Sequence, residues 1–517
     1  MEKTNILWAD DEIELLKPHI LFLKEKGYEV QTANNGSDAL DMVQDQDFDI
    51  VLLDENMPGI SGLETLIKIK QLKSDLPVIM ITKSEEEHIM EDAIGSKISD
   101  YLIKPVNPNQ ILLSLKKNLE NKRLIKEKTS SAYQQEFRNI GMQLSDRLSF
   151  DEWKDVYQKL VYWELELTKT KEEGMEEILR MQKSDANNLF SRYVIKNYES
   201  WLKGQSDDAP LMSHNVFKAK AIPEIDKSET TFLILIDNLR FDQWKVIKPI
   251  IGEYLKVDDE DIYCSILPTA TQYARNAFFA GMMPSEIEKR FPKMWLNDDD
   301  EGGKNQFEAD FLSEHLKRTG KDYKHTYTKV TNQAGGKKLA ENISNLMNNK
   351  LNVIVYNFVD MLSHARTEME VIRELADDEK AYRSITTSWM EHSPLLDIIK
   401  SIAERKAKVI ITTDHGTIRV KDPSKVIGDR NTNTNLRYKQ GKNLNYEQKD
   451  VYEVKNPADI FLPRINVSQT FIFAKEDLFF AYPNNYNYFV NYYRNTFQHG
   501  GISMEEMLIP FITLSAK

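Results

Sequence analysis

The 517-residue chain contains a single cysteine, Cys264, which excludes an internal disulfide and any metal site built from cysteine ligands. A bound metal would therefore need histidine and carboxylate ligands. Long apolar runs are also missing, since stretches such as 232–236 and 409–411 fall far short of the roughly 20 residues that span a membrane. The start, MEKTNILWADDE, lacks the basic and apolar segments of a signal peptide. We therefore expect a cytoplasmic protein without a membrane span.

Acidic residues outnumber basic ones, with 81 Asp and Glu residues against 68 Lys and Arg residues, which gives a net charge of −13. Duplex DNA binding needs a dense basic surface, and no helix-turn-helix signature stands out, so we expect no direct binding to duplex DNA. The remaining composition, 41% hydrophobic and 29% charged residues, is that of a globular protein. A chain of this length is expected to form about three domains.

Short apolar segments recur through the first 118 residues, with room for one helix between each pair. This alternation predicts a doubly wound parallel sheet in an α/β domain covering residues 1–118. The expected strands are Asn5–Ala9, Glu29–Ala33, Ile50–Asp54, Val78–Thr82 and Asp100–Ile103.

Residues 119–204 contain no proline and carry apolar residues at helical spacing, which predicts a bundle of three helices. Trp153, Val156, Leu160 and Trp163 form the expected buried stripe of one helix. After a loop at 204–210, strands are expected again at 231–236, 353–358 and 408–412. They predict a second, larger α/β domain over 211–517, in which 421–452 is a long insertion.

Polar residues end several strands of the first domain, where ligands of open parallel sheets bind. Asp10, Asp11 and Asp54 are expected to converge there with Thr82 and Lys104. Carboxylates beside a lysine suit a hard cation such as Mg²⁺ and leave one carboxylate to accept a phosphoryl group.

This set of residues, with Met57-Pro58-Gly59 after the acceptor, closely resembles the response-regulator receiver family with its CheY-like fold. The resemblance implies that Asp54 is phosphorylated, that Asp10, Asp11 and Asp54 bind Mg²⁺, and that Lys104 contacts the phosphoryl group. It also implies that Thr82 and Tyr101 are the switch residues and that the Lys104–Pro105 peptide is cis. Lys83 departs from the family, which usually has a small residue there.

A second group of acids and histidines ends the strands of the larger domain. Mixed imidazole and carboxylate ligands suit Zn²⁺ better than Mg²⁺ alone, and two such metals can clamp a phosphoryl group. The members of the group are Asp237, Asp360, His364, Asp414, His415 and His499, together with Thr271.

The order of these residues resembles the alkaline phosphatase superfamily, especially its nucleotide pyrophosphatase/phosphodiesterase branch and the PglZ-type domain. The segment from Pro268 to Pro284 matches the nucleophile motif of that branch. By resemblance, Thr271 is the nucleophile and forms a phosphothreonine intermediate. The implied ligands of two zinc ions are, for one, Asp237, Thr271, Asp414 and His415, and for the other, Asp360, His364 and His499.

The expected oxyanion-binding asparagine is replaced by Ala274, so Arg275 or Asn276 is predicted to bind the substrate phosphate. Arginines and aromatic residues within 430–439 and 479–497 could stack on a nucleotide chain, although most of these aromatics are expected to pack inside the domain.

The order of receiver, helical bundle and phosphoesterase domain resembles the response regulators of the type IX secretion system in Bacteroidetes. The resemblance implies a sensor histidine kinase as partner, homodimerisation on phosphorylation, and zinc-dependent cleavage of cyclic or linear oligonucleotides. It also implies contacts with a sigma factor and secretion components. The alternative hypothesis is a signalling adaptor whose metal domain binds a partner protein without catalysis; the six supporting ligands favour the enzyme, and Ala274 leaves the adaptor open.

Overall fold

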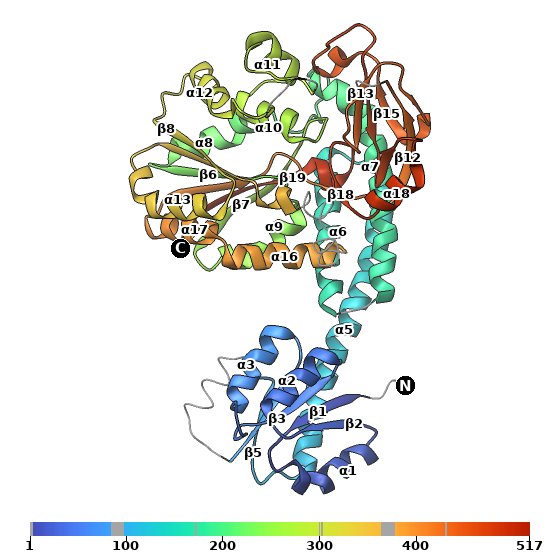
Figure 1. Ribbon diagram of the computed structural model, residues 1–517, viewed down its shortest axis with the longest axis vertical. Coiled ribbons are helices and arrows are strands. Elements are labelled where there is room, and N and C mark those ends of the chain that lie inside the picture. Colours follow the sequence, from blue (N-terminus) through green and yellow to red (C-terminus); the bar gives the residue numbers. More distant parts are fainter. Residues whose placement is uncertain are drawn as a thin grey trace. The chain divides into compact units, whose positions relative to one another are not determined.

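The computed structural model describes residues 4–83, 98–170, 173–298, 300, 303–362, 378–429 and 432–517. The chain forms two compact units, Met1–Ala132 and Tyr133–Lys517 (Figure 1). The expected division into 1–118, 119–204 and 211–517 remains a prediction. No helix in the described ranges is both long and apolar enough to cross a bilayer.

The first unit is a parallel sheet in the order β2-β1-β3-β4-β5, and its strands match the predicted ranges. They are β1 (Asn5–Ala9), β2 (Glu29–Ala33), β3 (Ile50–Asp54), β4 (Val78–Thr82) and β5 (Asp100–Ile103). The described helices of this unit are η1 (Ile13–Leu16), α1 (Lys17–Glu25), α2 (Gly36–Asp45) and α3 (Gly62–Leu72), followed by the start of α5 (Pro108–Ser145).

Alternation along β1 assigns its side chains to the two faces of this sheet. Leu7 and Ala9 pack in one apolar cluster, whereas Ile6 and Trp8 pack in another. Both faces are therefore buried, as expected for a parallel sheet covered by helices on each side.

The predicted helical region contains α5, α6 (Phe150–Thr170) and α7 (Glu173–Leu202). The first of these helices begins at Pro108, earlier than the predicted start of the bundle. Trp153, Val156 and Leu160 are buried and Trp163 is partly buried, which confirms the predicted stripe. These residues share one apolar core with the large sheet, so the bundle from Tyr133 onward packs as part of the second unit.

The second unit is built on a six-stranded sheet in the order β7-β19-β10-β6-β9-β8. The strands β10, β6, β9 and β8 run parallel, and β19 pairs antiparallel with β10 and β7. The strands are β6 (Thr231–Ile236), β7 (Leu255–Cys264), β8 (His325–Val330), β9 (Leu351–Tyr356), β10 (Lys408–Thr412) and β19 (Leu508–Ala516). The predicted strands 231–236 and 408–412 are confirmed, and the third begins and ends two residues earlier than predicted.

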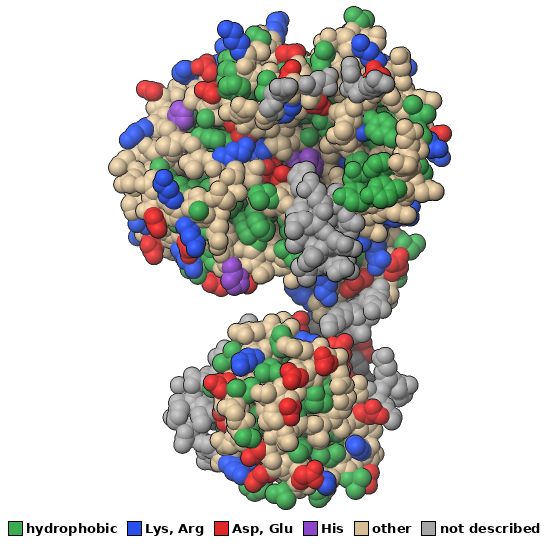
Figure 2. All heavy atoms as spheres, viewed as in Figure 1, with side chains coloured by type: hydrophobic (Ala, Val, Ile, Leu, Met, Phe, Trp, Pro, Cys, Tyr) green, Lys and Arg blue, Asp and Glu red, His purple; other side chains and the backbone are tan. Residues whose placement is uncertain are grey.

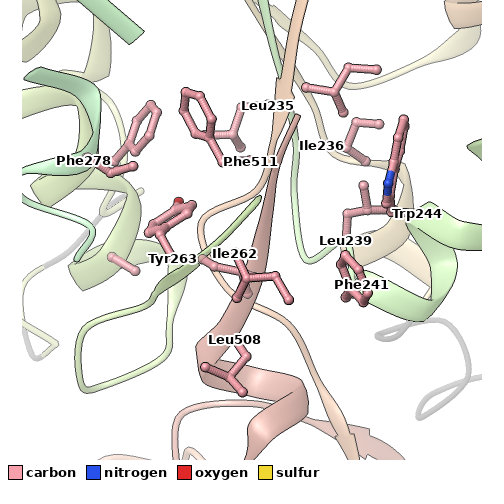
Figure 3. Close-up of a cluster of buried hydrophobic side chains, with 14 of the residues drawn as sticks. Leu235, Ile236, Leu239, Phe241, Trp244, Ile262, Tyr263, Phe278, Leu508 and Phe511 are labelled. Carbon is pink, nitrogen blue, oxygen red and sulfur yellow. The ribbon is translucent and has the colours of Figure 1, made fainter. Parts of the chain in front are cut away.

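Both faces of this sheet are apolar. Figure 3 shows Leu235, Tyr263 and Phe278 on one side of the strands and Ile236 and Trp244 on the other. The surrounding helical elements are η2 (Phe217–Ala221), α8 (Ile222–Lys227), α9 (Phe241–Ile251), α10 (Thr271–Ala280), α11 (Pro284–Arg290), α12 (Glu308–Arg318), α13 (Gln333–Leu346), α16 (Glu379–His392) and α17 (Pro394–Glu404).

The predicted insertion at 421–452 folds together with residues up to 498 into small sheets beside the main one. Their strands are β11 (Ile418–Arg419), β12 (Asp422–Ile427), β13 (Tyr438–Gly441), β14 (Asn445–Tyr446), β15 (Val451–Val454), β16 (Thr470–Ala474), β17 (Leu478–Ala481) and β18 (Phe497–Gln498). The helical elements in and after this region are η3 (Gln448–Asp450), η4 (Pro457–Ile460), α18 (Tyr486–Tyr493) and α19 (Met504–Met507).

Candidate active site

Three carboxylates meet at the C-terminal ends of β1 and β3 in the first unit. One ligand atom each from Asp10, Asp11 and Asp54 lies within 4.8 Å of the others. Lys104 Nζ lies 2.8 Å from Asp10 Oδ2 and 2.9 Å from Asp54 Oδ1. Oxygen-only ligands of this kind fit Mg²⁺.

Burial sets the ionisation of this first site. It raises the pKa of Asp54, although the hydrogen bond from Lys104 opposes the rise. Burial lowers the pKa of Lys104, but Asp10 and Asp54 outweigh it and raise that pKa above its ordinary value. The lysine therefore stays charged beside the carboxylates.

The remaining receiver residues lie on neighbouring strand ends. Thr82 ends β4 and is fully buried, and the half-buried Tyr101 on β5 interacts with it through a hydrogen bond. The Lys104–Pro105 peptide is cis, as the resemblance implies. Lys83 turns to Glu12, with 3.1 Å between Nζ and Oε2.

In the second unit, the acids predicted as metal ligands follow three adjacent strands. Asp237 follows β6, Asp414 and His415 follow β10, and Asp360 lies in a short helical segment after β9. Ligand atoms of Asp237, Asp414 and His415 lie within 4.8 Å of one another. On the face shown in Figure 2, acidic, basic and histidine side chains gather near the middle of this unit. His364 lies outside the described residues.

Thr271 is the first residue of α10 and reaches the same cluster. Its Oγ1 lies 3.1 Å from His415 Nε2. The Thr271 carbonyl accepts a hydrogen bond from Asn305 Nδ2 at 3.0 Å. The hydroxyl thus stands at a helix N-terminus, where unpaired backbone N–H groups favour an anion.

The two described histidines of the predicted set stack on each other. The ring centroids of His415 and His499 are 4.3 Å apart. His499 Nδ1 lies 3.0 Å from the Thr269 carbonyl, and His415 Nδ1 lies 3.2 Å from the Gly416 carbonyl. Carbonyls accept only, so each Nδ1 carries a proton, and in the neutral ring that a metal binds Nε2 would then offer the lone pair.

Arg275 occupies the inner side of this carboxylate cluster and is 1% exposed. Its Nη2 donates to Asp237 Oδ2 at 2.8 Å. Its Nε lies 3.0 Å from Glu308 Oε1 and 3.4 Å from Asp414 Oδ2. Sequence reasoning missed Glu308, because a single glutamate at the start of a helix carries no motif.

Asn276, the other predicted substrate ligand, is also 1% exposed. It donates to the Lys304 carbonyl at 3.2 Å and accepts from Asn305 at 3.3 Å. Both side chains are therefore engaged with the protein. Their role toward substrate remains a prediction.

Two carboxylate oxygens in the cluster are suited to bind a metal cation. Among the described residues, none donates a hydrogen bond to the buried Asp237 Oδ1 or Asp414 Oδ2, although Arg275 Nε lies 3.4 Å from Asp414 Oδ2. Burial raises the pKa of Asp237 well above its ordinary value, with Arg275 opposing the rise. Burial also acts to raise the pKa of Asp414, but His415 and Arg275 outweigh it and lower that pKa. This set of oxygen and imidazole donors suits Zn²⁺.

The described basic and aromatic residues of 432–439 and 479–497 range from buried to exposed. Arg437 is fully buried and its Nη2 lies 2.7 Å from Glu506 Oε2. Tyr438, Lys439 and Phe479 are also buried, whereas Tyr482 and Tyr486 are partly buried and Tyr488 is 64% exposed, so the expectation that most of these aromatics pack inside remains a prediction.

Three family models match this chain in succession. The response regulator receiver domain matches residues 6–116, the PorX response regulator linker domain matches 123–202, and the BREX system PglZ alkaline phosphatase-like domain matches 216–514.

Curated relatives share the N-terminal part. The transcriptional regulatory protein ZraR of Klebsiella oxytoca is 34% identical over 140 residues, which is 27% of this chain and 32% of that protein. The transcriptional regulatory protein ResD of Bacillus subtilis is 32% identical over 114 residues, or 22% of this chain and 47% of that protein. The chain thus spans less than half the length of these two relatives, so their activities are not carried over.

Solved structures also match the first unit. The response regulator TrrA of Thermotoga maritima, in complex with Mg(2+)-BeF, is 35% identical, covers 22% of this chain and 99% of its own, and has a TM-score of 0.21. A CheY-like receiver domain from Methanospirillum hungatei is 28% identical over 23% of this chain and 96% of its own, with a TM-score of 0.23.

Proposed function

The chain belongs to the PglZ alkaline phosphatase-like family, and from this premise we propose that its second unit is a two-zinc phosphodiesterase that cleaves cyclic or linear oligonucleotides through Thr271. The observation that carries the proposal is the 3.1 Å approach of Thr271 Oγ1 to His415 Nε2, inside a cluster of buried carboxylates. A surface threonine without a function is not expected to lie beside a histidine and a cluster of buried carboxylates.

The chain's own residues would hold the two metals. Asp237, Thr271, Asp414 and His415 would bind one, and Asp360, His364 and His499 would bind the other. When bound, such metals stabilise negative charge on a nucleophile and on phosphoryl oxygens.

The residues around Thr271 prepare its oxygen for attack. Asn305 fixes the Thr271 carbonyl, and the first turn of α10 places backbone N–H groups beside Oγ1. Oγ1 loses its proton and forms a bond to phosphorus, one ester O–P bond breaks, and the departing alkoxide takes up a proton, so that the net transfer is of the hydroxyl proton to the leaving alcohol. Water then hydrolyses the phosphothreonine and restores the hydroxyl.

Substrate binding is proposed to involve Arg275 and Asn276. Arg275 Nη1 makes no hydrogen bond to any described residue, so this donor remains for a phosphate oxygen. Ala274 is fully buried, and its methyl group cannot donate to an oxyanion.

The first unit makes the chain a two-component response regulator, and a receiver domain implies a sensor histidine kinase as partner. We propose phosphorylation at Asp54 with bound Mg²⁺, followed by homodimerisation. We further propose that the protein acts in the cytoplasm to regulate type IX secretion, with contacts to a sigma factor and secretion components.

The test is hydrolysis of bis(p-nitrophenyl) phosphate, with a short dinucleotide in parallel, by zinc-loaded wild type and Thr271→Val. We expect turnover by the wild type and none by Thr271→Val, with the zinc content of the variant nearly unchanged. Thr387→Val, a matched change on α16, controls for nonspecific loss and should keep wild-type turnover.

Equal turnover by Thr271→Val would refute the nucleophile. Zinc binding without turnover by the wild type would favour the adaptor, in which the metal domain binds a partner protein.

A further inference from the structure

We propose that Arg275 is a positioning residue for the zinc-ligand carboxylates and that Glu308 is the residue that anchors it. This inference rests on the proposed metal site. It assigns a function to two buried side chains, one predicted from sequence as a substrate ligand and the other not predicted at all.

The guanidinium of Arg275 lies between anions from three separate segments. Asp237 comes from the end of β6, Asp414 from the end of β10, and Glu308 from the start of α12. All of these side chains, including Arg275, are at most 1% exposed. A buried arginine in such surroundings remains charged and keeps its planar arrangement of donors.

Hydrogen bonds engage one oxygen of each zinc-ligand carboxylate, while Arg275 Nε lies 3.4 Å from the other oxygen of Asp414. Arg275 donates a hydrogen bond to Asp237 Oδ2, and Asp237 Oδ1 accepts no hydrogen bond from a described residue. Asp414 Oδ1 accepts hydrogen bonds from the Asn238 backbone N–H and from the Thr413 hydroxyl, at 3.3 Å each. Asp414 Oδ2 accepts no hydrogen bond from a described residue. Hydrogen bonds therefore hold each carboxylate by one oxygen, and the other oxygen accepts no hydrogen bond from a described residue. This is the arrangement by which outer-shell partners orient metal ligands.

Glu308 contacts Arg275 at a different nitrogen from Asp237. Its Oε1 forms an ion pair with Arg275 Nε at 3.0 Å, and its Oε2 accepts a hydrogen bond from the Tyr327 hydroxyl. Lys329 Nζ lies 3.6 Å from the same Oε2. Without Glu308, the guanidinium would keep its charge but lose the contact that sets its angle toward Asp237.

A lysine could not replace this arginine. One ammonium group can neutralise a carboxylate, but it cannot extend planar donors toward Glu308 and Asp237 at the same time. The geometry therefore distinguishes a positioning role from a role of charge alone.

The experiment measures the zinc dissociation constant of the full-length protein by competition with a chromogenic chelator, in the absence of substrate. We expect Arg275→Gln and Glu308→Gln each to weaken zinc binding by about 10- to 100-fold, the range seen when outer-shell partners of metal ligands are removed. Arg275→Lys should weaken it to a similar extent. Lys329→Gln removes a charge beside Glu308 without touching either zinc ligand and should leave the constant within about twofold.

The double variant separates positioning from general damage. If Glu308 acts only through Arg275, Arg275→Gln combined with Glu308→Gln should bind zinc no more weakly than Arg275→Gln alone. Multiplied losses, full rescue by Arg275→Lys, or tighter zinc binding by Arg275→Gln would each overturn the inference.

A milder change covers the case in which the buried variants do not fold. Tyr327→Phe keeps the ring and removes only the hydroxyl that holds Glu308, and it should weaken zinc binding severalfold. Unchanged affinity in both Tyr327→Phe and Glu308→Gln would refute the anchor. If the wild type binds no zinc, the proposed function and this inference both fail; if the wild type binds zinc but these variants match it, only the inference fails.

Discussion

Arg383 on α16 donates to Glu164 on α6, with 2.6 Å between Nη1 and Oε1, although 219 positions separate the two residues. Arg383 Nη1 also lies 3.1 Å from Asp242 Oδ2, and Lys183 Nζ lies 2.6 Å from Glu164 Oε2. Asp242 in turn accepts from Arg240, three positions after the zinc-ligand candidate Asp237. Buried ion pairs thus join the helical bundle to the segment that carries the candidate site.

Glu164→Gln is expected to destabilise the second unit by about 3 kcal/mol, because it leaves buried Lys183 and Arg383 short of a counter-charge. Burial acts to raise the pKa of Glu164, but Lys183 and Arg383 outweigh it and hold that pKa well below its ordinary range. A lowered pKa stabilises the folded state above the ordinary carboxyl value of about 4.3, and this contribution is lost as the pH falls toward the folded-state pKa.

Thermal unfolding from pH 7 to pH 3 checks this prediction. The difference between wild type and Glu164→Gln should be largest at neutral pH and should shrink below about pH 4. Glu166→Gln, on the same helix but paired with the more exposed Lys169, is the matched control and should change little. A difference that grows on acidification would contradict the assignment.

Asp54→Asn is expected to abolish phosphorylation by acetyl phosphate in the presence of Mg²⁺, because the amide cannot accept the phosphoryl group. Intact-mass spectrometry before and after incubation provides the measurement. Asp45→Asn, an exposed position at the end of α2, should be phosphorylated like the wild type. Phosphate on Asp54→Asn would place the acceptor elsewhere.

Chelation of zinc is expected to lower the melting temperature of the second unit. A ligand at 100 times its dissociation constant adds about 2.7 kcal/mol of stability, and chelation removes that contribution. Asp414→Asn should make the melting temperature insensitive to EDTA, because it removes a proposed zinc ligand. The Oδ2 atom of Asp414 accepts no hydrogen bond from a described residue and is the oxygen proposed to bind zinc. Asp397→Asn, an exposed change on α17, should keep the EDTA effect. Scanning calorimetry with and without EDTA measures both, and an EDTA effect that persists in Asp414→Asn would count against this ligand.

Lys439→Met is expected to stabilise the second unit at pH 6 by at least about 1 kcal/mol, since burying an ammonium without a counter-ion is costly. Lys439 is 1% exposed and forms no ion pair with a described residue, and burial lowers its pKa to about 7. Its Nζ donates to the Asn433 carbonyl at 2.9 Å.

The pH dependence of this stabilisation follows from the lowered pKa of Lys439. Below pH 7 both folded and unfolded chains carry the charge, so the wild type bears the full cost. Between pH 7 and the ordinary lysine pKa of about 10.4, only the unfolded chain is protonated, so the wild type gains stability as the pH rises. The advantage of Lys439→Met should therefore narrow toward pH 10 in denaturant titrations. Lys442→Met, at an exposed position nearby, should show no such trend.

Local pattern was sufficient to predict the strands and the residues at their ends. Every strand of the first unit matches its predicted range, because the strand-forming residues and the turn residues that bound them lie within one short segment. Asp237, Asp414 and His415 meet as predicted, since the ends of adjacent parallel strands share one edge of a sheet.

Contacts between distant segments could be decided only by the tertiary structure. The sequence predicts Arg275 as a phosphate ligand, and that role remains a prediction; only the tertiary structure shows that its guanidinium contacts Asp237 and Glu308, which lie 38 positions before it and 33 after it. Only the tertiary structure shows that apolar residues of the bundle share one core with the large sheet and that Glu164 pairs with Arg383. Periodicity records which face of an element is apolar, but the partner of a buried charge depends on the packing of segments that the sequence does not place side by side.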